Sequence, residues 1–412
     1  MKNFFFKVVF LLVVLATAFS SCKTDEPNQP NNTEVHTSIF DKGDGTQLNP
    51  FIITTPEQLD SVRNNLSAYY KLGNNIDLTS YLTSGGAGYN NGAGWDPLGF
   101  QINPLRGSFD GAGYKITGLW INRSSEDAVG LFSFMANGSV QNLAVEIANN
   151  NGGVKGHDQV GGLVGAMAQS NVTNCCIIGM GTINGNDNVG GMVGNAGWGG
   201  NTIANCYSTI VVNGSEYVGS LSGVLNGDGN IIANCYTSGT VNGNKDVGGI
   251  VGRVNISTIT NCYATGSVNG ADIYVGGVAG GVSTGGKVFT CYSIGKVNGN
   301  NYVGGVAGVI FDNSYTTNCV ALNPNVTGNN NYVGRVVGYV QNSSLGNNWA
   351  RNDMTITANG SSKTLSTGND MVDGVDCAAI PAASWWTSVS PNGPGWSSSV
   401  WYFANEQLPI FQ

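Results

Sequence analysis

A short motif of valine and glycine sets the hydrophobic pattern of the chain. Two further landmarks, an asparagine-cysteine pair and an asparagine-glycine pair, stay in phase with this motif. Internal periods of this length are typical of solenoids, in which each repeat forms one structural unit. A degenerate earlier copy lies at Val129-Gly130-Leu131-Phe132. The full motif, Val-Gly-x-x-x-Gly, starts at seven positions spaced by 29, 29, 29, 28, 28 and 30 residues: Val160, Val189, Val218, Val247, Val275, Val303 and Val333.

One repeat, residues 247–272, shows which elements the pattern predicts. Three short strands are expected over residues 247–252, 256–260 and 262–268, because apolar and β-branched residues dominate there. The unit closes at the turn residues Asn269-Gly270. At roughly 3.3 Å per residue such a repeat has a contour of about 90 Å, enough for one coil with three strands and their corners. We therefore predict an all-β parallel β-solenoid with one coil per 28–30 residues and capping segments at its ends.

Stacked coils place equivalent residues above one another, so the landmark residues are expected to form columns. Cysteines on successive coils are expected to be free thiols, because equivalent side chains point the same way, which is poor geometry for a disulfide bond. Disulfides are the alternative if the protein is exported. The cysteines are expected to form an internal column of small hydrophobic residues: Cys175, Cys206, Cys235, Cys262, Cys291 and Cys319. The preceding asparagines are expected to form a ladder at a bend, each amide bonding to the neighbouring coil: Asn174, Asn205, Asn234, Asn261 and Asn318.

Two sets of tyrosines keep the same period and are the candidate ligand-binding residues. Outward-pointing aromatic columns on a solenoid suit contact with a glycan or a protein, although they can also serve only to stabilise the sheet. The first set follows the column cysteines and is expected to form an exposed ladder: Tyr207, Tyr236, Tyr263 and Tyr292. The second set precedes the Val-Gly motif and is interrupted by Asp246: Tyr217, Tyr274, Tyr302 and Tyr332.

The flanking segments predict the domain organisation. Thr55, Pro56 and Gln58 have the spacing of a helix N-cap, a first-turn proline and a capping box, so one short helix is expected there. We expect a signal peptide over residues 1–21, a flexible tether over 22–40 and an N-terminal leader or cap over 41–128. The repeat solenoid is expected over 129–346 and an aromatic-rich C-terminal cap over 347–412.

The N-terminus predicts export and anchoring. A basic start and an apolar run from Phe4 to Ala18 are typical of a secretory signal that is too short to span a bilayer. Small residues precede Cys22, which resembles the lipidation site of bacterial lipoproteins, although an ordinary cleaved signal is the alternative. We expect a protein anchored to the bacterial outer membrane through lipid at Cys22 and exposed at the surface, with the lipid anchor as its only contact with the membrane.

Composition and charge narrow the class of partner. The chain has 62 glycines in 412 residues, 10% charged residues and 41% hydrophobic residues, which is too apolar for disorder and too glycine-rich for a helical domain. The formal net charge is −8, and no basic run offers a binding surface to nucleic acid or to an anionic membrane. The expected partner is therefore an extracellular glycan or protein, with no nucleic acid.

The motifs VGGLVG, NCY and Gly-x-Val-x-Gly together resemble the GLUG repeat family, over roughly residues 129 to 346. The resemblance implies a right-handed β-helix on a bacterial surface. Some family members carry the repeat beside IgA-specific zinc metallopeptidases, and many resemble adhesins. It does not imply a catalytic activity for this chain.

Catalytic chemistry finds little support in the sequence, so we expect no enzyme, no metal ion and no cofactor. The chain has only His36 and His157, lacks a His-Glu-x-x-His motif and has no marked catalytic triad. Cleavage of a polysaccharide by paired carboxylates is an alternative, with Asp77, Asp96 and Asp110 as candidates.

We interpret the chain as a surface adhesin or binding protein that presents a repetitive face. A carbohydrate-active β-helix enzyme and a structural spacer or assembly subunit are the alternatives. An enzyme needs a non-repetitive acidic cluster in a groove, whereas a binding protein needs only the repeated face, and the sequence shows the repeated face.

Overall fold

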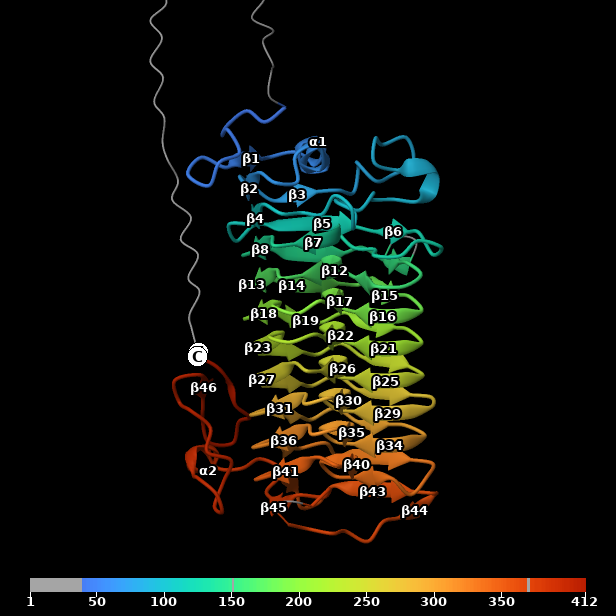
Figure 1. Cartoon of the computed structure of the whole chain (residues 1–412), viewed down its shortest axis with the longest axis vertical. Coiled ribbons are helices and arrows are strands. Elements are labelled where there is room, and N and C mark those ends of the chain that lie inside the picture. Colours follow the sequence, from blue (N-terminus) through green and yellow to red (C-terminus); the bar gives the residue numbers. More distant parts are fainter. Residues whose placement is uncertain (1–38, 150–151, 369–370) are drawn as a thin grey trace, which may run out of the picture. The chain divides into compact units, whose positions relative to one another are not determined.

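The protein is a stack of coils made of short strands. The structure is a computed structural model that describes residues 39–149, 152–368 and 371–412, and residues 39–412 fold as one compact unit. In Figure 1 the coils follow one another in sequence order, and successive coils pair through parallel strands. Two antiparallel pairings occur in the C-terminal part: β43 (Thr355–Ala358) with β44 (Ser361–Ser362), and β46 (Trp401–Tyr402) with β47 (Ile410–Phe411). The predicted fold class, a parallel β-solenoid with one coil per repeat, is confirmed.

Four parallel sheets run along the described part of the stack. The twenty-stranded sheet carries the cysteine and tyrosine landmarks, and its strands are β1 (Phe51–Ile53), β2 (Tyr69–Leu72), β3 (Ile76–Asp77), β4 (Ser108–Asp110), β5 (Lys115–Leu119), β8 (Ser139–Gln141), β9 (Ala144–Ile147), β13 (Asn171–Thr173), β14 (Cys176–Gly179), β18 (Thr202–Ala204), β19 (Tyr207–Ser208), β23 (Ile231–Thr237), β27 (Thr258–Ala264), β31 (Lys287–Phe289), β32 (Tyr292–Ser293), β36 (Tyr315–Thr317), β37 (Val320–Ala321), β41 (Ser344–Gly346), β42 (Trp349–Arg351) and β45 (Val375–Cys377).

The other sheets form the remaining sides of each coil. A ten-stranded sheet contains β6 (Ile121–Asn122), β10 (Val154–Lys155), β15 (Thr182–Asn184), β20 (Val211–Asn213), β24 (Val241–Gly243), β28 (Val268–Gly270), β33 (Val297–Asn298), β38 (Asn325–Gly328), β43 (Thr355–Ala358) and β44 (Ser361–Ser362). A seven-stranded sheet contains β11 (Val160–Gly161), β16 (Asp187–Gly190), β21 (Glu216–Gly219), β25 (Lys245–Gly248), β29 (Ile273–Gly276), β34 (Asn301–Gly304) and β39 (Val333–Gly334). An eight-stranded sheet contains β7 (Phe132–Ala136), β12 (Val164–Ala168), β17 (Val193–Ala196), β22 (Ser222–Asn226), β26 (Val251–Asn255), β30 (Ala279–Ser283), β35 (Ala307–Phe311) and β40 (Val337–Gln341).

The Val-Gly-x-x-x-Gly motif forms a corner between two strands, so the prediction of one strand over residues 247–252 was wrong. Strand β25 ends at Gly248 and strand β26 begins at Val251. A Cβ atom on Gly249 would lie 2.1 Å from the carbonyl oxygen of Gly277 in the next coil. The motif glycines therefore allow the backbones of successive coils to approach at the corner, which a pattern of apolar residues alone does not distinguish from a strand.

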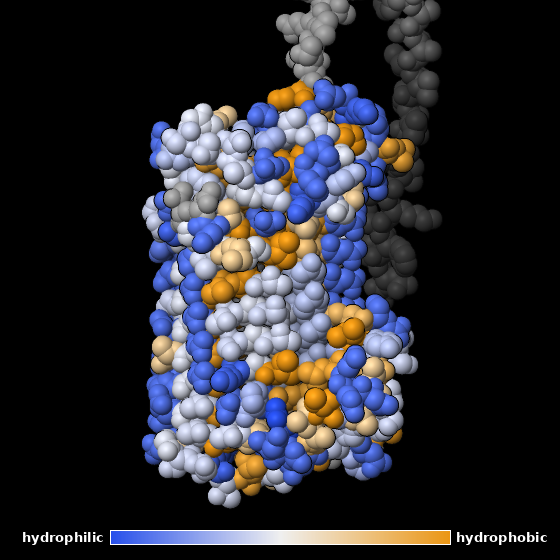
Figure 2. Space-filling model, turned by 180° about the vertical axis from the view of Figure 1, so that it is seen from behind, coloured by the Kyte–Doolittle hydropathy of each residue, from blue (hydrophilic) through white to orange (hydrophobic). Residues whose placement is uncertain are grey.

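Inward side chains from all sides of each coil fill a continuous apolar core. In one coil, for example, Val251, Ile259 and Val268 are at most 1% exposed. On the outside, the face in Figure 2 shows separate apolar patches among residues of near-neutral and hydrophilic character.

The predicted helix is present near the N-terminal end of the described residues. Helix α1 (Pro56–Asp60) starts after Thr55, whose side chain accepts a hydrogen bond from the backbone N–H of Gln58, and continues into the 3-10 helix η1 (Ser61–Asn64). A second 3-10 helix, η2, spans Asn90–Gly92. Leu59 and Val62 are fully buried and join the main core.

The C-terminal segment, residues 383–412, lies against the side of the stack (Figure 1). It contains helix α2 (Ala383–Thr387), β46 (Trp401–Tyr402) and β47 (Ile410–Phe411). Trp386 and Trp401 are fully buried in a second apolar cluster that also includes Tyr292 and Trp349 of the stack. The segment thus covers outward-facing residues of the twenty-stranded sheet.

Candidate functional site

The first tyrosine set forms a column of stacked rings, which we call the tyrosine ladder. Strand pairing places Tyr207, Tyr236, Tyr263 and Tyr292 in register on four successive coils. Their successive ring centroids are 4.8, 5.1 and 4.9 Å apart, with interplanar angles of 10° or less. Neighbouring parallel strands lie about 4.8 Å apart, so identical aromatic side chains on successive coils stack. Cys176 takes the same position one coil earlier.

The prediction that the whole ladder is exposed was wrong: the first half, Tyr207 and Tyr236, is half-buried, and the C-terminal segment covers the second half, Tyr263 and Tyr292. Tyr292 is 1% exposed, and its hydroxyl donates a hydrogen bond to the carbonyl oxygen of Pro409 at 2.7 Å. The ring of Tyr263 lies 5.4 Å from that of Phe411 and 6.1 Å from that of Trp401. Burial raises the pKa of Tyr263 to about 12. The C-terminal segment supplies these contacts, and its irregular sequence gave no signal for where it would pack.

The first half of the ladder borders a groove. One cavity of about 360 Å³ is lined by residues that include Asn205, Asn234 and Tyr236, and Phe411 of the C-terminal segment closes one side of it. A second cavity of about 360 Å³ shares Asn205 and continues past Tyr207 and Cys176 toward Asn142. The two cavities together place the edges of tyrosine rings, side-chain amides and the thiol of Cys176 along the outer surface of several successive coils.

The asparagines beside this groove form the predicted ladder, although not without gaps. Asn174 donates to the side-chain oxygen of Asn142 at 3.1 Å, and Asn234 donates to that of Asn205 at 3.2 Å. Further along, Asn261 donates to Asn234 at 3.2 Å. The landmark asparagines have φ near +54°, a left-handed backbone that asparagine tolerates better than most residues. In the coil after Asn261 the ladder position is Thr290; the ladder resumes at Asn318, which accepts from Asn347 at 2.8 Å.

The landmark cysteines form the predicted internal column. All six are at most 1% exposed, and among the described residues every cysteine is a free thiol. The backbone N–H of Cys206 donates to the sulfur of Cys235 at 3.4 Å, which links successive coils. Burial raises the pKa of the thiols of Cys206, Cys235, Cys262 and Cys291 well above the ordinary value. These groups are structural, because a nucleophilic cysteine needs a lowered pKa and access to solvent.

A second asparagine ladder was missed by the sequence analysis, which treated its members only as turn residues. Each side-chain amide donates to the side-chain oxygen in the preceding coil at 2.9 to 3.0 Å. The signal was available, because the Asn-Gly pairs recur in phase with the other landmarks. The ladder runs through Asn184, Asn213, Asn242, Asn269 and Asn298.

The second tyrosine set does not form one uniform column. Tyr302 and Tyr332 stack at 4.9 Å, and Tyr274 lies 5.2 Å from Tyr302 at a tilt of 44°. Asp246 separates Tyr217 from Tyr274 along the column. Its buried carboxylate binds the guanidinium of Arg253 through two hydrogen bonds of 2.8 Å. That guanidinium lies 5.6 Å from the ring centroids of both Tyr217 and Tyr274. At the position where the tyrosine column is interrupted, the Arg253 cation therefore contacts the tyrosine rings on both sides.

His157 lies beside the carboxylates of Asp158, its neighbour in the sequence, and of Asp127, which the fold brings in from the preceding coil. Its Nδ1 lies 2.9 Å from Asp127 and 3.5 Å from Asp158, and one ligand atom of each residue lies within 4.8 Å of the others. The hydrogen bond with Asp127 raises the pKa of His157. Asp158 also accepts from the backbone N–H of Asp187 at 3.1 Å, and Asp187 accepts from that of Glu216 at 3.2 Å. The carboxylates therefore connect neighbouring coils.

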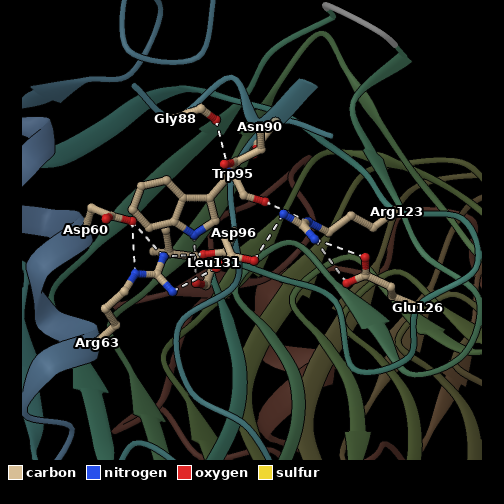
Figure 3. Close-up of polar contacts among 10 residues, drawn as sticks. Asp60, Arg63, Gly88, Asn90, Trp95, Asp96, Arg123, Glu126 and Leu131 are labelled. Atoms are coloured by element: carbon tan, nitrogen blue, oxygen red, sulfur yellow. Dashed lines mark hydrogen bonds and ion pairs between the residues drawn. The ribbon is translucent and has the colours of Figure 1, made fainter. Parts of the chain in front are cut away.

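The carboxylates considered for polysaccharide cleavage have structural contacts. Asp96 lies between Arg63 and Arg123 at 2.9 and 3.0 Å, and Arg63 also pairs with Asp60 at 2.6 Å (Figure 3). These ion pairs connect the 3-10 helix η1, which carries Arg63, to the first coils.

Asp77 and Asp110 accept hydrogen bonds from nearby backbone N–H groups, those of Thr79 at 2.9 Å and Ala112 at 2.8 Å. No hydrogen bond joins Asp77, Asp96 and Asp110 to one another within the described residues. A cavity of about 430 Å³ near the N-terminal coils is lined by Tyr69, Lys71 and Asp110 among other mainly polar residues.

The model of the GLUG motif matches residues 243–269, which run from one Asn-Gly turn to the next and make up one coil. The chain contains the GLUG motif. A protein of Evansella cellulosilytica, provisionally named a Gly-rich membrane protein, is 41% identical over 115 residues, which are 27% of this chain and 13% of that protein. Halomucin of Haloquadratum walsbyi is 33% identical over 133 residues, which are 31% of this chain and 1% of halomucin. This GLUG-motif chain thus matches only a small part of these relatives.

Two solved structures resemble the GLUG-motif chain. A protein of Bacteroides ovatus, provisionally named an immunoglobulin A1 protease, has a TM-score of 0.49 at 21% identity, covering 90% of this chain and 95% of that one. A structure named IgA1 protease has a TM-score of 0.41 at 14% identity, covering 73% of this chain and 21% of that one.

Proposed function

We propose that the protein is a cell-surface adhesin that binds an extracellular ligand along the first half of the tyrosine ladder. The observation that carries this proposal is the groove beside Tyr207 and Tyr236. The edges of the stacked rings offer apolar contact area at a low cost in conformational entropy, and the amides of Asn174, Asn205 and Asn234 offer donors and acceptors at the spacing of the coils. A ligand that extends along the stack can meet the same pair of groups repeatedly.

The proposal includes an anchor at Cys22 and a location on the bacterial outer membrane. Cys22 and the preceding signal lie outside the described residues. One sequence relative is named a membrane protein and the other halomucin, and both names support a location in the cell envelope. Among the residues that the structure describes, none belongs to a helix long and apolar enough to cross a bilayer. A lipid anchor at the N-terminus would supply membrane attachment without such a helix.

Binding of the full-length protein in detergent micelles to a glycan array, to mucin and to extracellular matrix proteins tests the proposal. The informative variant carries Tyr207→Ser and Tyr236→Ser, which removes both uncovered rings. The matched control is Tyr315→Ser, because Tyr315 is 44% exposed on another column of the same sheet. We expect saturable binding by the wild type and the control, and at least about tenfold weaker binding by the double variant, since each ring contact contributes about 0.5–1.5 kcal/mol.

The same experiment separates the adhesin from its alternatives. Failure of the intact protein to bind any ligand on these panels would contradict the adhesin assignment and favour a structural spacer. Shortening of a glycan during incubation would instead favour a carbohydrate-active enzyme. Equal binding by the double variant and the wild type would place the binding site away from the tyrosine ladder.

A further inference from the structure

The second half of the tyrosine ladder already binds a polypeptide, which is the chain's own C-terminal segment. The ladder hydroxyl of Tyr292 donates to the backbone carbonyl of Pro409 at 2.7 Å. Asn347, which continues the asparagine ladder, donates to the backbone carbonyl of Gly393 at 3.2 Å. Both ladders therefore contribute hydrogen bonds to the main chain of the segment that covers them.

Aromatic side chains of the segment complete this contact. Phe411 lies 5.4 Å from the ring of Tyr263, and Trp396 lies 6.0 Å from the ring of Tyr292. Trp401 contacts both tyrosines at 6.0 to 6.1 Å. The occupant is thus a segment with spaced aromatic residues, in which Trp401 of β46 and Phe411 of β47 are paired, and it is held by ring contacts and by hydrogen bonds to its carbonyl groups.

The first half of the ladder repeats the same groups, and no segment among the described residues covers it. Tyr207 and Tyr236 continue the ring stack, and Asn174 and Asn205 continue the amides with exposed side chains. Phe411 reaches only the edge of this half, at 6.5 Å from Tyr236, and forms one wall of the cavity that opens there. The uncovered groove is therefore continuous with the surface that the C-terminal segment occupies.

We propose that this uncovered half binds an extended segment of another protein that carries spaced aromatic side chains. The inference rests on the proposed function and specifies its ligand as a polypeptide. The segment of a second copy is a poor candidate for the occupant, because Trp386 and Trp401 of each copy are fully buried against its own stack. A partner polypeptide would follow the same course as the C-terminal segment, with aromatic rings against Tyr207 and Tyr236 and carbonyl groups toward the asparagine amides.

Fluorescence anisotropy with a labelled peptide tests this inference on the full-length protein in detergent micelles. The peptide has the sequence of residues 396–412, and a matched peptide carries serine in place of its Trp and Phe residues. We expect saturable binding of the first peptide, at least about tenfold weaker binding of the serine peptide, and at least about tenfold weaker binding of the first peptide by the variant with Tyr207→Ser and Tyr236→Ser. The control Tyr315→Ser is expected to bind like the wild type.

Two outcomes would overturn the inference. One is the absence of saturable peptide binding. The other is peptide binding that the double variant retains in full, because a peptide that displaced the C-terminal segment from the second half would behave in this way. Glycan binding that depends on Tyr207 and Tyr236, in the absence of peptide binding, would overturn the polypeptide ligand while leaving the adhesin assignment intact.

Discussion

Asp246 occupies a position that tyrosine occupies in the coils before and after it, and its carboxylate is fully buried against Arg253. Two effects oppose each other at this residue. Burial disfavours the charged form, whereas the guanidinium favours it. Burial is the larger effect and raises the pKa of Asp246 to about 6 from an ordinary value of 3.8.

The raised pKa gives a pH dependence with a definite sign. Between pH 3.8 and about 6 the folded protein holds a proton on Asp246 that the unfolded chain has released, so this group stabilises the fold as the pH falls through that window. We expect the free energy of unfolding of the wild type to rise relative to Asp246→Asn between pH 7 and pH 4, as measured by denaturant titration. A relative fall on acidification would mean that the pair with Arg253 outweighs burial.

The column thiols are expected to be inert in the folded protein. Each column cysteine is at most 1% exposed, and burial raises the pKa of Cys206 and Cys235 well above the ordinary value. In a version that lacks the first 32 residues, we expect a thiol reagent to modify at most Cys176 and Cys377, which are 8% and 7% exposed, and to modify all eight cysteines after denaturation. Reaction of several thiols without unfolding would show that the column opens to solvent.

At the scale of the element, side-chain ladders connect successive coils in addition to the backbone hydrogen bonds. Asn242 lies within the second asparagine ladder and takes part in two amide hydrogen bonds, with Asn213 and Asn269. Asn298, at the end of this ladder, takes part in one such bond, with Asn269. An interior position should therefore contribute more to stability than a terminal one.

Alanine substitution at both positions measures this difference. Asn242→Ala removes two bonds and leaves two amide groups without their partner, at a cost of about 1–3 kcal/mol in the free energy of unfolding. We expect Asn298→Ala to cost roughly half as much, as measured by chemical denaturation. Equal costs at the two positions would indicate that the ladder bonds are replaced by water without loss.

The motif glycines at the corners permit the close stacking of coils. A Cβ atom on Gly223 would lie 2.5 Å from the backbone carbon of Asn188 and 2.6 Å from the carbonyl oxygen of Gly194. We expect Gly223→Ala to lower the free energy of unfolding by about 1–3 kcal/mol, because backbone atoms must move apart. Gly346→Ala is the control, since its Cβ would meet only a methyl group of Thr317, at 3.4 Å, and it should be nearly neutral.

At the scale of the whole molecule, the described residues form two apolar clusters with different origins. The first runs through the interior of the coils, and the second lies between the C-terminal segment and the outer face of the stack. Because each coil pairs with its neighbours, the stack holds its strands without the second cluster. The C-terminal segment depends on that cluster for its position.

Removal of the central tryptophan should therefore affect one part of the molecule. Trp386 is fully buried among Tyr292, Trp396 and Trp385. We expect Trp386→Ala to lower the free energy of local unfolding of residues 383–412 by about 3–5 kcal/mol. Hydrogen exchange should become faster in these residues and stay unchanged in the strands of the coils. Faster exchange throughout the coils would show that the two clusters unfold together.

The sequence by itself determined the coil, its period and most of its columns. Cys235, Asn234 and Tyr236 recur in phase with their counterparts, and one coil per repeat stacks such residues at the spacing of parallel strands. Burial of the cysteines and stacking of the tyrosines follow from this repetition, because the same local environment recurs in every coil.

Only the tertiary structure decided which half of the tyrosine ladder is open, and it also decided the contacts of single residues such as the pair of Asp246 with Arg253. The C-terminal segment has no period, so its sequence carried no information about the surface it covers. A repeat pattern fixes the contacts between equivalent residues, whereas contacts of non-repeating residues depend on the packing of the whole chain. The candidate site lies where these two kinds of contact meet, at the end of the segment beside Tyr236.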